Sequence, residues 1–567
     1  MEIHLTEQES QLCTLLDECT QYMKETEGIE TTCRIAGGWV RDKLLGHQCH
    51  DIDIALSEMM GVDFAQRFVK YCSEIKDVPV KGVTKIESNP EQSKHLETAR
   101  TTVLGSEIDF VNLRSEEYAV DSRIPTQVTF GTPLQDALRR DITINTLFYN
   151  VHSRSVEDHT GKGLDDLRNG IIRTPLPPRE TFLDDPLRVV RCVRFASRLG
   201  FDIVPELEAS VRDPKIKKAL VSKISRERIG EEIDKMMKGR DPFRSIKLIN
   251  DLSLHSCVFY LPPSFASTLS GPPGPAHTSL IAASILDRLL GQCSPTTSSS
   301  PLSSVSLPPL HPLLLAEHTN PPQNSPFPRV WLACALTPYR GLKCTDTKKK
   351  TQTAAEVVVR EGLKLGTQNR YLDGIPLLFD AWDLLRKEID TYTPDEHGGA
   401  EDRVRIGLLL REKAVHQSQM GVQWSTSMLF SLAQDLLACW DATQDKFDEK
   451  AATSRIEQYN SFVARIDELR LPAVLDARSI LDGRDTVRVL GVPPGKWTGV
   501  VLARVLEWQL QHPDGTKEQC EEWLRAEHAA GRINTSSDAR AGSPPSKRAK
   551  DPSTGEGDTK RAKRSPR

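Results

Sequence analysis

The first 250 residues alternate between segments patterned like strands and segments patterned like helices. In 50–56 (HDIDIAL), apolar residues alternate strictly with Asp51 and Asp53, which predicts a short strand. The polar, non-periodic stretch 81–100 predicts a mobile loop. We expect further strands at 31–36, 101–105 and 106–114, and helices starting near 39, at 63–75 and at 136–150.

From Thr181 the pattern is mostly helical to about residue 532. Pro- and Ser-rich stretches between about 261 and 328 are interpreted as two surface insertions around one short helix at 279–292. The expected fold class is an α+β head, with a small mixed β-sheet and helices, followed by a mostly α-helical neck, body and tail. The expected domains are the head at 1–160, the helical neck at 161–255, the insertions at 256–328, the helical body and tail at 329–535, and a disordered basic tail at 536–567.

The composition fits two to four domains, because 38% of the 567 residues are hydrophobic and 27% are charged. With 74 Lys and Arg against 78 Asp and Glu, the net charge is −4, which excludes a globally basic nucleic-acid coat. No run of 18 apolar residues occurs, so we expect no membrane partner. The 12 cysteines form no CxxC pair and no zinc-spaced cluster, which favours a reduced intracellular protein without a structural metal.

The two ends of the sequence bear on localisation. The acidic start lacks an apolar segment and an Arg-rich character, so we expect neither a secretory signal nor a mitochondrial presequence here, while an upstream start would leave a mitochondrial form open. Near the other end, a bipartite nuclear import signal and an RNA tether compete to explain two basic clusters. We favour import, and expect a protein of nucleus and cytoplasm. The clusters are Lys547, Arg548 and Lys550, then Lys560, Arg561, Lys563 and Arg564.

Asp51 and Asp53 are the first candidates for chemistry, since carboxylates two positions apart on a strand project from one face. Such neighbours repel each other unless a cation lies between them, and hard oxygen ligands suit Mg²⁺, which also takes substrate phosphates. The alternative is a solvated polar face of an edge strand. Upstream, the turn at Gly37 and Gly38 lets backbone N–H groups approach a phosphate at a helix start. Asp109 on a later strand is a third candidate, with Glu107 as its rival on the same face.

These residues resemble the nucleotidyltransferase superfamily that includes DNA polymerase β, and within it the eukaryotic and fungal class II tRNA nucleotidyltransferases, the CCA-adding enzymes. The resemblance covers residues 30–240 closely and the rest loosely. It implies that Asp51, Asp53 and Asp109 are catalytic and bind two Mg²⁺ ions, which activate an RNA 3′-hydroxyl and neutralise the triphosphate while pyrophosphate leaves. The first motif, a GG-x-V-R-D turn followed by D-x-D, matches Gly37, Gly38, Val40, Arg41, Asp42, Asp51 and Asp53.

The run 139–145 (RRDITIN) looks like the family's second motif. A carboxylate can accept from a ribose 2′-hydroxyl, a role we assign to Asp141, and Arg140 can clamp phosphate oxygens. The alternative is an Arg–Asp surface pair on a helix. Gly163 and Asp166, in a segment like the third motif, would form a hinge. The phosphate and ribose candidates are Gly37, Gly38, Arg41, Arg140, Asp141 and Asn145, with Arg139, Arg191 and Arg194 as further candidates.

Asp185 and Arg188, in 184–188 (DDPLR), form the most specific pair. Cytosine and adenine both offer an amine donor beside a ring-nitrogen acceptor, which a carboxylate and a guanidinium can pair with, whereas guanine and uracil offer the reverse. This protein-templating role belongs to the motif E-D-x-x-R that the segment resembles, with Asp184 in place of the usual Glu. The alternative is an ordinary helix start. Arg198 extends the basic stripe of Arg191 and Arg194, whose alternative is a solvated helix face.

The resemblance implies an enzyme that adds C, C and A to the 3′ end of tRNA from CTP and ATP, with the acceptor arm as partner and no obligate protein partner. Poly(A) polymerase is the nearest rival, but the basic, glycine-led segment of its bacterial members is missing after D-x-D. The loop 81–100 resembles the one that eukaryotic enzymes need for the final A, and 116–133 looks fungal or eukaryotic. A non-catalytic RNA-binding pseudo-enzyme would predict a damaged metal strand or base pocket, and both are intact.

Overall fold

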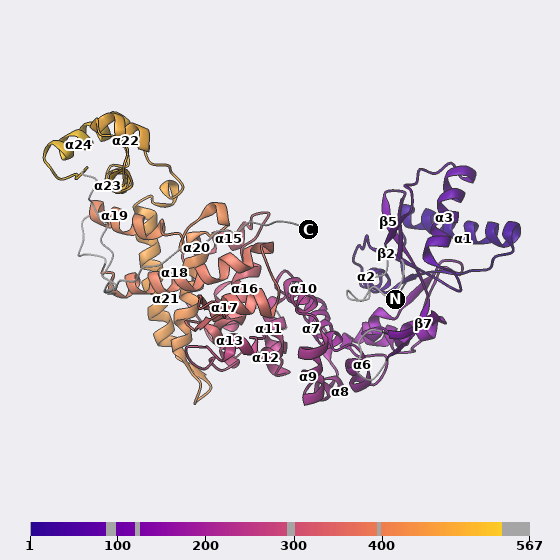
Figure 1. Ribbon diagram of the computed structural model, residues 1–567. Coiled ribbons are helices and arrows are strands. Elements are labelled where there is room, and N and C mark those ends of the chain that lie inside the picture. The colour runs from indigo at the N-terminus through magenta and orange to yellow at the C-terminus, as the bar shows by residue number, and fades with distance from the viewer. Residues whose placement is uncertain (1, 87–97, 119–124, 292–300, 394–398, 536–567) are drawn as a thin grey trace, which may run out of the picture. The chain divides into compact units, whose positions relative to one another are not determined.

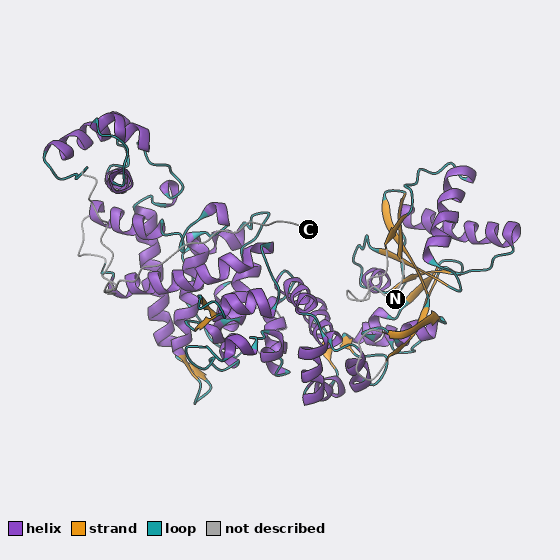
Figure 2. Ribbon diagram, viewed as in Figure 1, coloured by secondary structure: helices purple, strands orange, loops and turns teal. Residues whose placement is uncertain are grey.

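The computed structural model describes residues 2–86, 98–118, 125–291, 301–393 and 399–535. Its contacts divide the chain into a first unit, residues 1–396 and 409–475, and a second unit, residues 397–408 and 476–567. Strands gather in the N-terminal part, and helices dominate the rest, as Figures 1 and 2 show. The expected α+β head followed by helical parts is therefore confirmed.

The head contains a seven-stranded sheet in the order β3-β4-β5-β2-β1-β8-β9. All neighbours are antiparallel except β2 and β5, whose parallel register places Asp53 opposite Asp109. A separate hairpin joins β6 and β7. The strands are β1 (Cys33–Ala36), β2 (Ile52–Leu56), β3 (Thr84–Ile86), β4 (Thr98–Val103), β5 (Ser106–Asn112), β6 (Arg114–Tyr118), β7 (Pro125–Phe130), β8 (Phe148–Asn150) and β9 (Ser155–Glu157).

Helix α3 covers β4 and β5, where Phe64 and Phe68 lie 5.3 and 5.7 Å from the ring of Phe110. This aromatic cluster is fully buried and fixes the strand that carries Asp109. The helices of the head are α1 (Glu7–Glu27), α2 (Gly38–Leu44), α3 (Gly61–Lys70, continued by the π-turn Tyr71–Ile75), α4 (Pro133–Leu138) and the 3₁₀ turn η3 (Thr143–Asn145).

Two predictions for the head were wrong. The single helix expected at 136–150 is instead α4, a turn, η3 and strand β8, because β-branched residues are frequent after Asp141 and β8 pairs with β1 and β9. The loop expected at 81–100 contains β3 and the start of β4; β3 is an edge strand, so it shows no apolar alternation. Residues 87–97 of that loop, and 119–124 of the fungal-type block, lie outside the described residues.

The neck follows with short helices around two paired two-residue strands, β10 (Ile171–Ile172) and β11 (Asp202–Ile203). Pro178, Pro205, Pro214 and Pro242 are the first residues of helices, where proline is tolerated because no backbone N–H is required. The helices are α5 (Gly163–Asn169), α6 (Pro178–Asp184), α7 (Leu187–Leu199), α8 (Pro205–Val211), α9 (Pro214–Lys223), α10 (Arg226–Met237), α11 (Pro242–Asp251) and α12 (His255–Val258).

The body packs around α14, which contacts α11, α16 and α20. Ten of its thirteen residues are buried, so the helix expected between surface insertions is a central element of the core, as its apolar character on all sides requires. The main body elements are α13 (Pro263–Ala266), α14 (His277–Leu289), α15 (Ala316–Thr319), α16 (Phe327–Ala335), η6 (Thr337–Tyr339), α17 (Ala354–Val357), α18 (Tyr371–Thr391), α20 (Trp424–Asp435), η10 (Leu436–Cys439), α21 (Glu449–Glu468), and the strand pairs β12 (Lys343–Thr345) with β13 (Thr351–Thr353) and β14 (Trp440–Asp441) with β15 (Lys446–Phe447).

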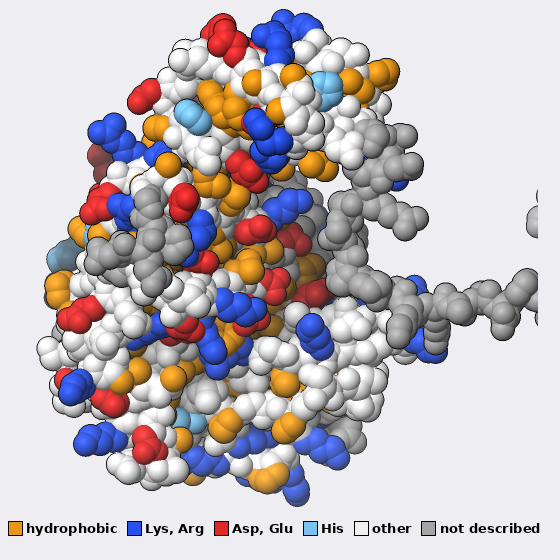
Figure 3. Space-filling view, turned by 90° about the vertical axis from the view of Figure 1, so that its left-hand side faces the viewer, with side chains coloured by type: hydrophobic (Ala, Val, Ile, Leu, Met, Phe, Trp, Pro, Cys, Tyr) orange, Lys and Arg blue, Asp and Glu red, His pale blue; other side chains and the backbone are white. Residues whose placement is uncertain are grey.

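The second unit has a small core of its own, in which Trp497 and Trp508 are nearly fully buried with Leu524. Its helices are α22 (Gly483–Leu490), α23 (Trp497–Gln511) and α24 (Lys517–Ala529), and most of α19 (Gly399–Leu410) also belongs to it. The basic clusters from Lys547 to Arg564 lie outside the described residues. Acidic and basic side chains are interspersed on the face in Figure 3, as the near-zero net charge predicts. Nowhere in the described chain is a helix both long and apolar enough to cross a membrane.

Candidate active site

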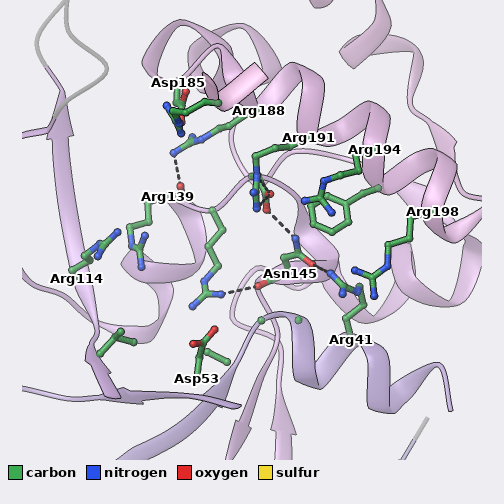
Figure 4. A pocket seen from close by; sticks show the side chains of 18 residues that line it. Arg41, Asp53, Arg114, Arg139, Asn145, Asp185, Arg188, Arg191, Arg194 and Arg198 are labelled. Atoms are coloured by element: carbon green, nitrogen blue, oxygen red, sulfur yellow. Dashed lines mark hydrogen bonds and ion pairs between the residues drawn. The ribbon is translucent and has the colours of Figure 1, made fainter. Parts of the chain in front are cut away.

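A cavity of about 560 Å³ lies between the sheet of the head and helices α7 and α10 of the neck. Figure 4 shows Asp53 at one side of it, Asp185 and Arg188 at the other, and further arginines between them. The charged residues that line it are Arg41, Asp53, Arg114, Arg139, Arg140, Asp141, Asp185, Arg188, Arg191, Arg194, Arg198 and Arg228. Nine guanidiniums against three carboxylates make a strongly cationic space, which suits a triphosphate.

The turn between β1 and α2 forms one wall of the cavity. Gly37 has φ +69°, and a Cβ atom there would lie 2.7 Å from Nη1 of Arg140, so only glycine fits. The first turn of α2 brings in Arg41, which is buried and donates to Oδ1 of Asn145 at 2.5 Å. Burial lowers the pKa of Arg41, against the opposing charge of Asp42. The sequence therefore folds Gly37, Gly38, Arg41 and Asn145 into one wall, and their contacts with phosphate or ribose stay a prediction.

The acidic residues lie on the adjacent strands. Asp53 lines the cavity, and burial, together with the charges of Asp51 and Asp109, raises its pKa to about 6. Asp51 is exposed and lies just before β2, not within it. Asp109 accepts two 2.7 Å hydrogen bonds from Arg100, whereas Glu107 is exposed and lies 3.7 Å from the same guanidinium. The register opposite Asp53 thus favours Asp109 over Glu107 as a third carboxylate.

These carboxylates fit a hard divalent cation, because burial, and after it repulsion from Asp51 and Asp109, shifts the pKa of Asp53 upward, and a bound cation would offset both. Within the described ranges, no three His, Cys, Asp or Glu side chains are already gathered as a metal-binding group. Arg100 holds Asp109 in an ion pair with one hydrogen bond to each oxygen, so a cation shared with Asp53 would bind the remaining lone pairs of Asp109 or displace Arg100.

A carboxylate that sequence analysis missed organises the next wall. Asp136 is buried and binds both Arg139 and Arg140: its Oδ2 accepts from Nε and Nη2 of Arg140 at 3.0 and 2.8 Å. Burial alone would raise the pKa of Asp136, but the two guanidiniums hold it at about 2. Asp136 lies three and four residues before Arg139 and Arg140, a spacing at which helical side chains meet, so this spacing could have predicted the two ion pairs.

Asp141 is also fully engaged. It accepts from the backbone N–H of Ile142 at 2.9 Å, from Asn145 at 3.0 Å and twice from Arg191 at 2.8 and 2.7 Å. The guanidinium of Arg191 outweighs burial and holds the pKa of Asp141 at about 2. Because a carboxylate offers about four acceptor sites, a ribose hydroxyl can bind Asp141 only if one of these donors moves.

Gly163 and Asp166 hold α5 against the turn η3. A Cβ atom on Gly163 would lie 2.7 Å from Leu147 and 2.9 Å from the carbonyl oxygen of Thr143. Asp166 accepts from the Thr143 hydroxyl at 2.7 Å and from Arg173 at 3.1 Å. The two predicted hinge residues are thus tight contacts that fix the turn carrying Asn145.

The predicted templating pair lies where α6 ends and α7 begins. Asp185 is not in a helix; its Oδ1 accepts from the backbone N–H of Leu187 at 3.1 Å, as a helix-capping side chain does. Arg188 is buried and donates from Nη2 to the carbonyl oxygen of Arg139 at 2.6 Å. Both side chains line the same cavity, so the structure brings together the two groups that the motif predicted.

Arg228 on α10 is a further lining residue to which the sequence gave no role. Its Nη2 donates to Oδ2 of Asp185 at 3.1 Å, while its Nη1 is buried without a hydrogen-bond partner among the described residues. The contact fixes one oxygen of Asp185 and leaves lone pairs of that carboxylate for a base amine. Arg228 is therefore a positioning residue for Asp185.

We expect Arg228→Lys to weaken selection between CTP and UTP by about tenfold, because lysine keeps the charge but loses the planar fork that orients the carboxylate. The measurement is the ratio of kcat/KM for CTP to that for UTP on a tRNA lacking its 3′ end. Arg198→Lys, on the same cavity but bound to Asp42, is the matched control. Equal ratios in the two variants would show that Arg228 does not orient Asp185.

The stripe on α7 is solvated only in part: Arg198 is exposed, Arg191 is half-buried and Arg194 is buried. Arg194 is buried and donates to Glu232 of α10 at 2.5 Å, while Arg198 lies 3.2 Å from Asp42. Phe195 serves as a common platform, with the guanidiniums of Arg194, Arg41 and Arg191 at 4.1, 5.2 and 5.6 Å from its ring centre. Sequence analysis missed Phe195 because an aromatic residue on a buried helix face has no distinguishing pattern.

Comparison with known proteins first indicates the class of enzyme to which the chain belongs. The description "Poly A polymerase head domain" matches residues 33–173, and "Probable RNA and SrmB- binding site of polymerase A" matches residues 200–268. The fold and the cavity thus define a nucleotidyltransferase with a polymerase-type head. The mitochondrial CCA tRNA nucleotidyltransferase of Saccharomyces cerevisiae is 36% identical over 548 residues, covering 92% of this chain and 94% of that protein. The chain belongs to the CCA tRNA nucleotidyltransferase family, as its motifs predicted.

Other relatives agree with this assignment. The tRNA nucleotidyltransferase cca1 of Schizosaccharomyces pombe is 34% identical over 527 residues, covering 91% of this chain and 95% of that protein. Among solved structures, the Bacillus stearothermophilus CCA-adding enzyme in complex with CTP aligns with a TM-score of 0.54 at 18% identity, covering 93% of this chain and 99% of that chain. The Thermotoga maritima CCA-adding enzyme complexed with tRNA aligns with a TM-score of 0.54 at 18% identity, covering 91% of this chain and 96% of that chain. These structures show that the fold is shared.

Proposed function

We propose that the protein adds C, C and A stepwise to the 3′ end of tRNA from CTP and ATP, without a nucleic-acid template, and releases pyrophosphate. The observation that carries the proposal is one cationic cavity with Asp53 at one side and the Asp185–Arg188 pair at the other. Relatives that match along almost the whole chain are named for this activity. The acceptor arm of tRNA is the proposed partner.

In the proposed mechanism, the protein supplies the pairing edge. A free lone pair of Asp185 accepts from the amine of cytosine or adenine, and an N–H of Arg188 donates to the adjacent ring nitrogen. Arg228 and the N–H of Leu187 hold the carboxylate, and the carbonyl of Arg139 holds the guanidinium. Uracil and guanine would present a carbonyl to Asp185 and an N–H to Arg188, so both contacts would be repulsive.

The phosphates would lie among Arg140, Arg41 and the Gly37–Gly38 turn. Asp136 fixes Arg140, and Asn145 fixes Arg41, so these guanidiniums need little reorganisation when the substrate binds. Asp51, Asp53 and Asp109 would hold Mg²⁺, which when bound supplies positive charge to the attacking and leaving oxygens. If the cation displaced Arg100 from Asp109, Glu107 on the neighbouring strand, now 3.7 Å from the same guanidinium, could still pair with it.

The proposed domain roles follow the same order along the chain. Residues 1–160 form the catalytic head and 161–255 the neck with the templating pocket. Gly163 and Asp166 are proposed to form the hinge between the head and the neck, through their contacts with the turn η3. Residues 329–535 would bind tRNA.

A single assay tests this function. The protein is incubated with a tRNA lacking its 3′ end, Mg²⁺ and each labelled NTP, singly and together. We expect two C additions with CTP alone, three nucleotides with CTP and ATP, and no further extension. Long A tracts would instead identify a poly(A) polymerase-type adenylyltransferase, and no addition at all would favour the RNA-binding pseudo-enzyme.

Localisation is proposed on separate grounds. The relatives from Saccharomyces cerevisiae and Candida glabrata are named as mitochondrial enzymes, which supports a mitochondrial form of this one. We propose nuclear and cytoplasmic pools as well, directed by the basic clusters between Lys547 and Arg564.

Removal of residues 543–567 should shift a fluorescently tagged protein out of the nucleus and leave CCA addition in vitro unchanged, because the segment carries basic clusters but no residue of the cavity. Replacing the seven basic residues of the two clusters with glutamine should have the same effect. Unaltered localisation together with a raised Kd for tRNA would identify the segment as an RNA tether.

A further inference from the structure

The body contains a second cavity, of about 900 Å³, that the proposed reaction does not use. Its walls come from α14, η6, α18, η10, β14 and α21. One rim is the Pro-rich segment 270–277 (SGPPGPAH), which includes Pro272, Gly274 and Pro275. Backbone hydrogen bonds fix this rim: Ser270 donates to Lys343 at 2.8 Å, and Gly274 donates to Pro338 at 2.8 Å. A segment that looked like a surface insertion therefore shapes a pocket.

Aromatic and guanidinium groups face each other in this pocket. The guanidiniums of Arg340 and Arg386 lie 4.3 and 5.3 Å from the ring centre of Trp382, whose indole N–H donates to Asp435 at 2.6 Å. Trp440 of β14 also lines the pocket, and its ring centre lies 5.9 Å from that of His277. Its indole nitrogen is buried and has no hydrogen-bond partner among the described residues, so it can donate to a ligand only when the side chain turns toward the pocket.

The charges of the pocket favour an anion. Arg455 is neutralised by Asp435 at 2.5 Å and by Asp390 at 2.8 Å. Arg340, by contrast, has no carboxylate within 4 Å in the described chain, and it donates only to the main-chain oxygen and Oε1 of Gln434, at 3.3 and 3.1 Å. Asp435 and Asp383 act on its charge only from a greater distance, so this half-buried cation, whose hydrogen-bond partners are neutral, gains from a bound phosphate, because charge-assisted hydrogen bonds are stronger than neutral ones.

We propose that this pocket binds one unstacked nucleotide of the tRNA substrate. The base would lie against the aromatic walls of Trp382 and Trp440, its phosphate would accept from Arg340, and the indole N–H of Trp440 would donate to a base carbonyl or phosphate oxygen. Aromatic faces and guanidinium planes are the surfaces on which proteins bind splayed RNA bases. A peptide would use the apolar walls but would leave Arg340 without an anion. The inference rests on tRNA being the substrate.

The test measures the Kd of the full-length protein for a tRNA lacking its 3′ end, by filter binding at several salt concentrations. We expect Arg340→Gln to raise the Kd about tenfold and to lower the salt slope by about one, as loss of one phosphate contact does. Trp440→Phe keeps a smaller aromatic ring but removes the N–H, and should raise the Kd about threefold. Lys387→Gln is the matched control: it removes one positive charge from the exposed face of the same helix α18, outside the pocket, and should change the Kd less than about twofold.

The outcomes separate cleanly. Because Arg340 is half-buried, thermal unfolding must first show that Arg340→Gln folds; if it does not, the exposed Arg386→Gln replaces it, with the same expected rise in Kd. A Kd equal to that of Lys387→Gln overturns the nucleotide pocket, even if a proline-rich or acidic peptide binds there instead. If the wild-type protein from the same preparation does not add CCA to the tRNA, the proposed function is overturned instead.

Discussion

Asp53→Ala should abolish nucleotide addition, with kcat falling by about 10³-fold or more, because removing one group that stabilises charge at a reacting centre already costs about 10² to 10³. Of the three candidate metal ligands Asp51, Asp53 and Asp109, only Asp53 lines the cavity directly, where it faces Arg140 and the glycine turn. Single-turnover addition of the first C to a tRNA lacking its 3′ end measures the effect without interference from product release.

Two controls make this result interpretable. Glu107→Ala removes an exposed carboxylate from the same strand face as Asp109 and should retain near-wild-type kcat. Burial and the neighbouring charges raise the pKa of Asp53 to about 6, so its charged form destabilises the folded state at neutral pH. The Tm of Asp53→Ala should therefore not fall. Turnover near wild type in Asp53→Ala, or loss of turnover in Glu107→Ala, would show that the acidic strand is wrongly assigned.

Arg188→Ala should relax selection among NTPs more than it weakens tRNA binding. The variant loses the donor to the ring nitrogen of cytosine or adenine and also the donor that clashes with the N–H of uracil or guanine. A hydrogen bond to a charged group contributes about 1.5–3 kcal/mol, so we expect the preference for CTP over UTP to fall by about 10- to 100-fold. The measurement is kcat/KM for each of the four NTPs, with the Kd for tRNA measured in parallel.

The comparison with Arg194→Ala separates base selection from general damage. Arg194 lies on the same helix and lines the same cavity, but it binds Glu232 and stacks on Phe195 instead of facing Asp185. Its loss should lower kcat/KM for all four NTPs by a similar factor. If Arg188→Ala also lowers all four equally, discrimination does not arise from the Asp185–Arg188 pair.

Much of the site could be predicted from sequence because its groups belong to short, contiguous motifs. The spacing of Gly37, Asp53, Asp141 and Arg188 within those motifs was enough to expect one pocket, and the structure does bring these residues to one cavity. Element types in the head were predicted well where apolar alternation is strict, as in β2 and β5. The edge strand β3 and the turn before η3 were missed, because tertiary pairing determines them more than local pattern does.

The supporting residues could not be predicted in the same way. Phe195 contacts Arg41 of α2, and Arg228 of α10 contacts Asp185 before α7; no local spacing reveals either contact. The four hydrogen bonds on Asp141 and the ion pair of Arg100 with Asp109 likewise depend on packing between distant segments. The body pocket required the fold, since its rim comes from a Pro-rich segment whose composition is typical of loops.

The single carboxylate of Asp136 has a mechanical consequence. Since it grips Arg139 and Arg140 together, the two guanidiniums form one rigid fork anchored on α4. Cytosine and adenine differ by a whole ring in width, yet such an anchor would seat both triphosphates at one height. The difference in size must then be absorbed at the opposite end, where Asp185 lies between α6 and α7 and Arg228 of α10 holds it.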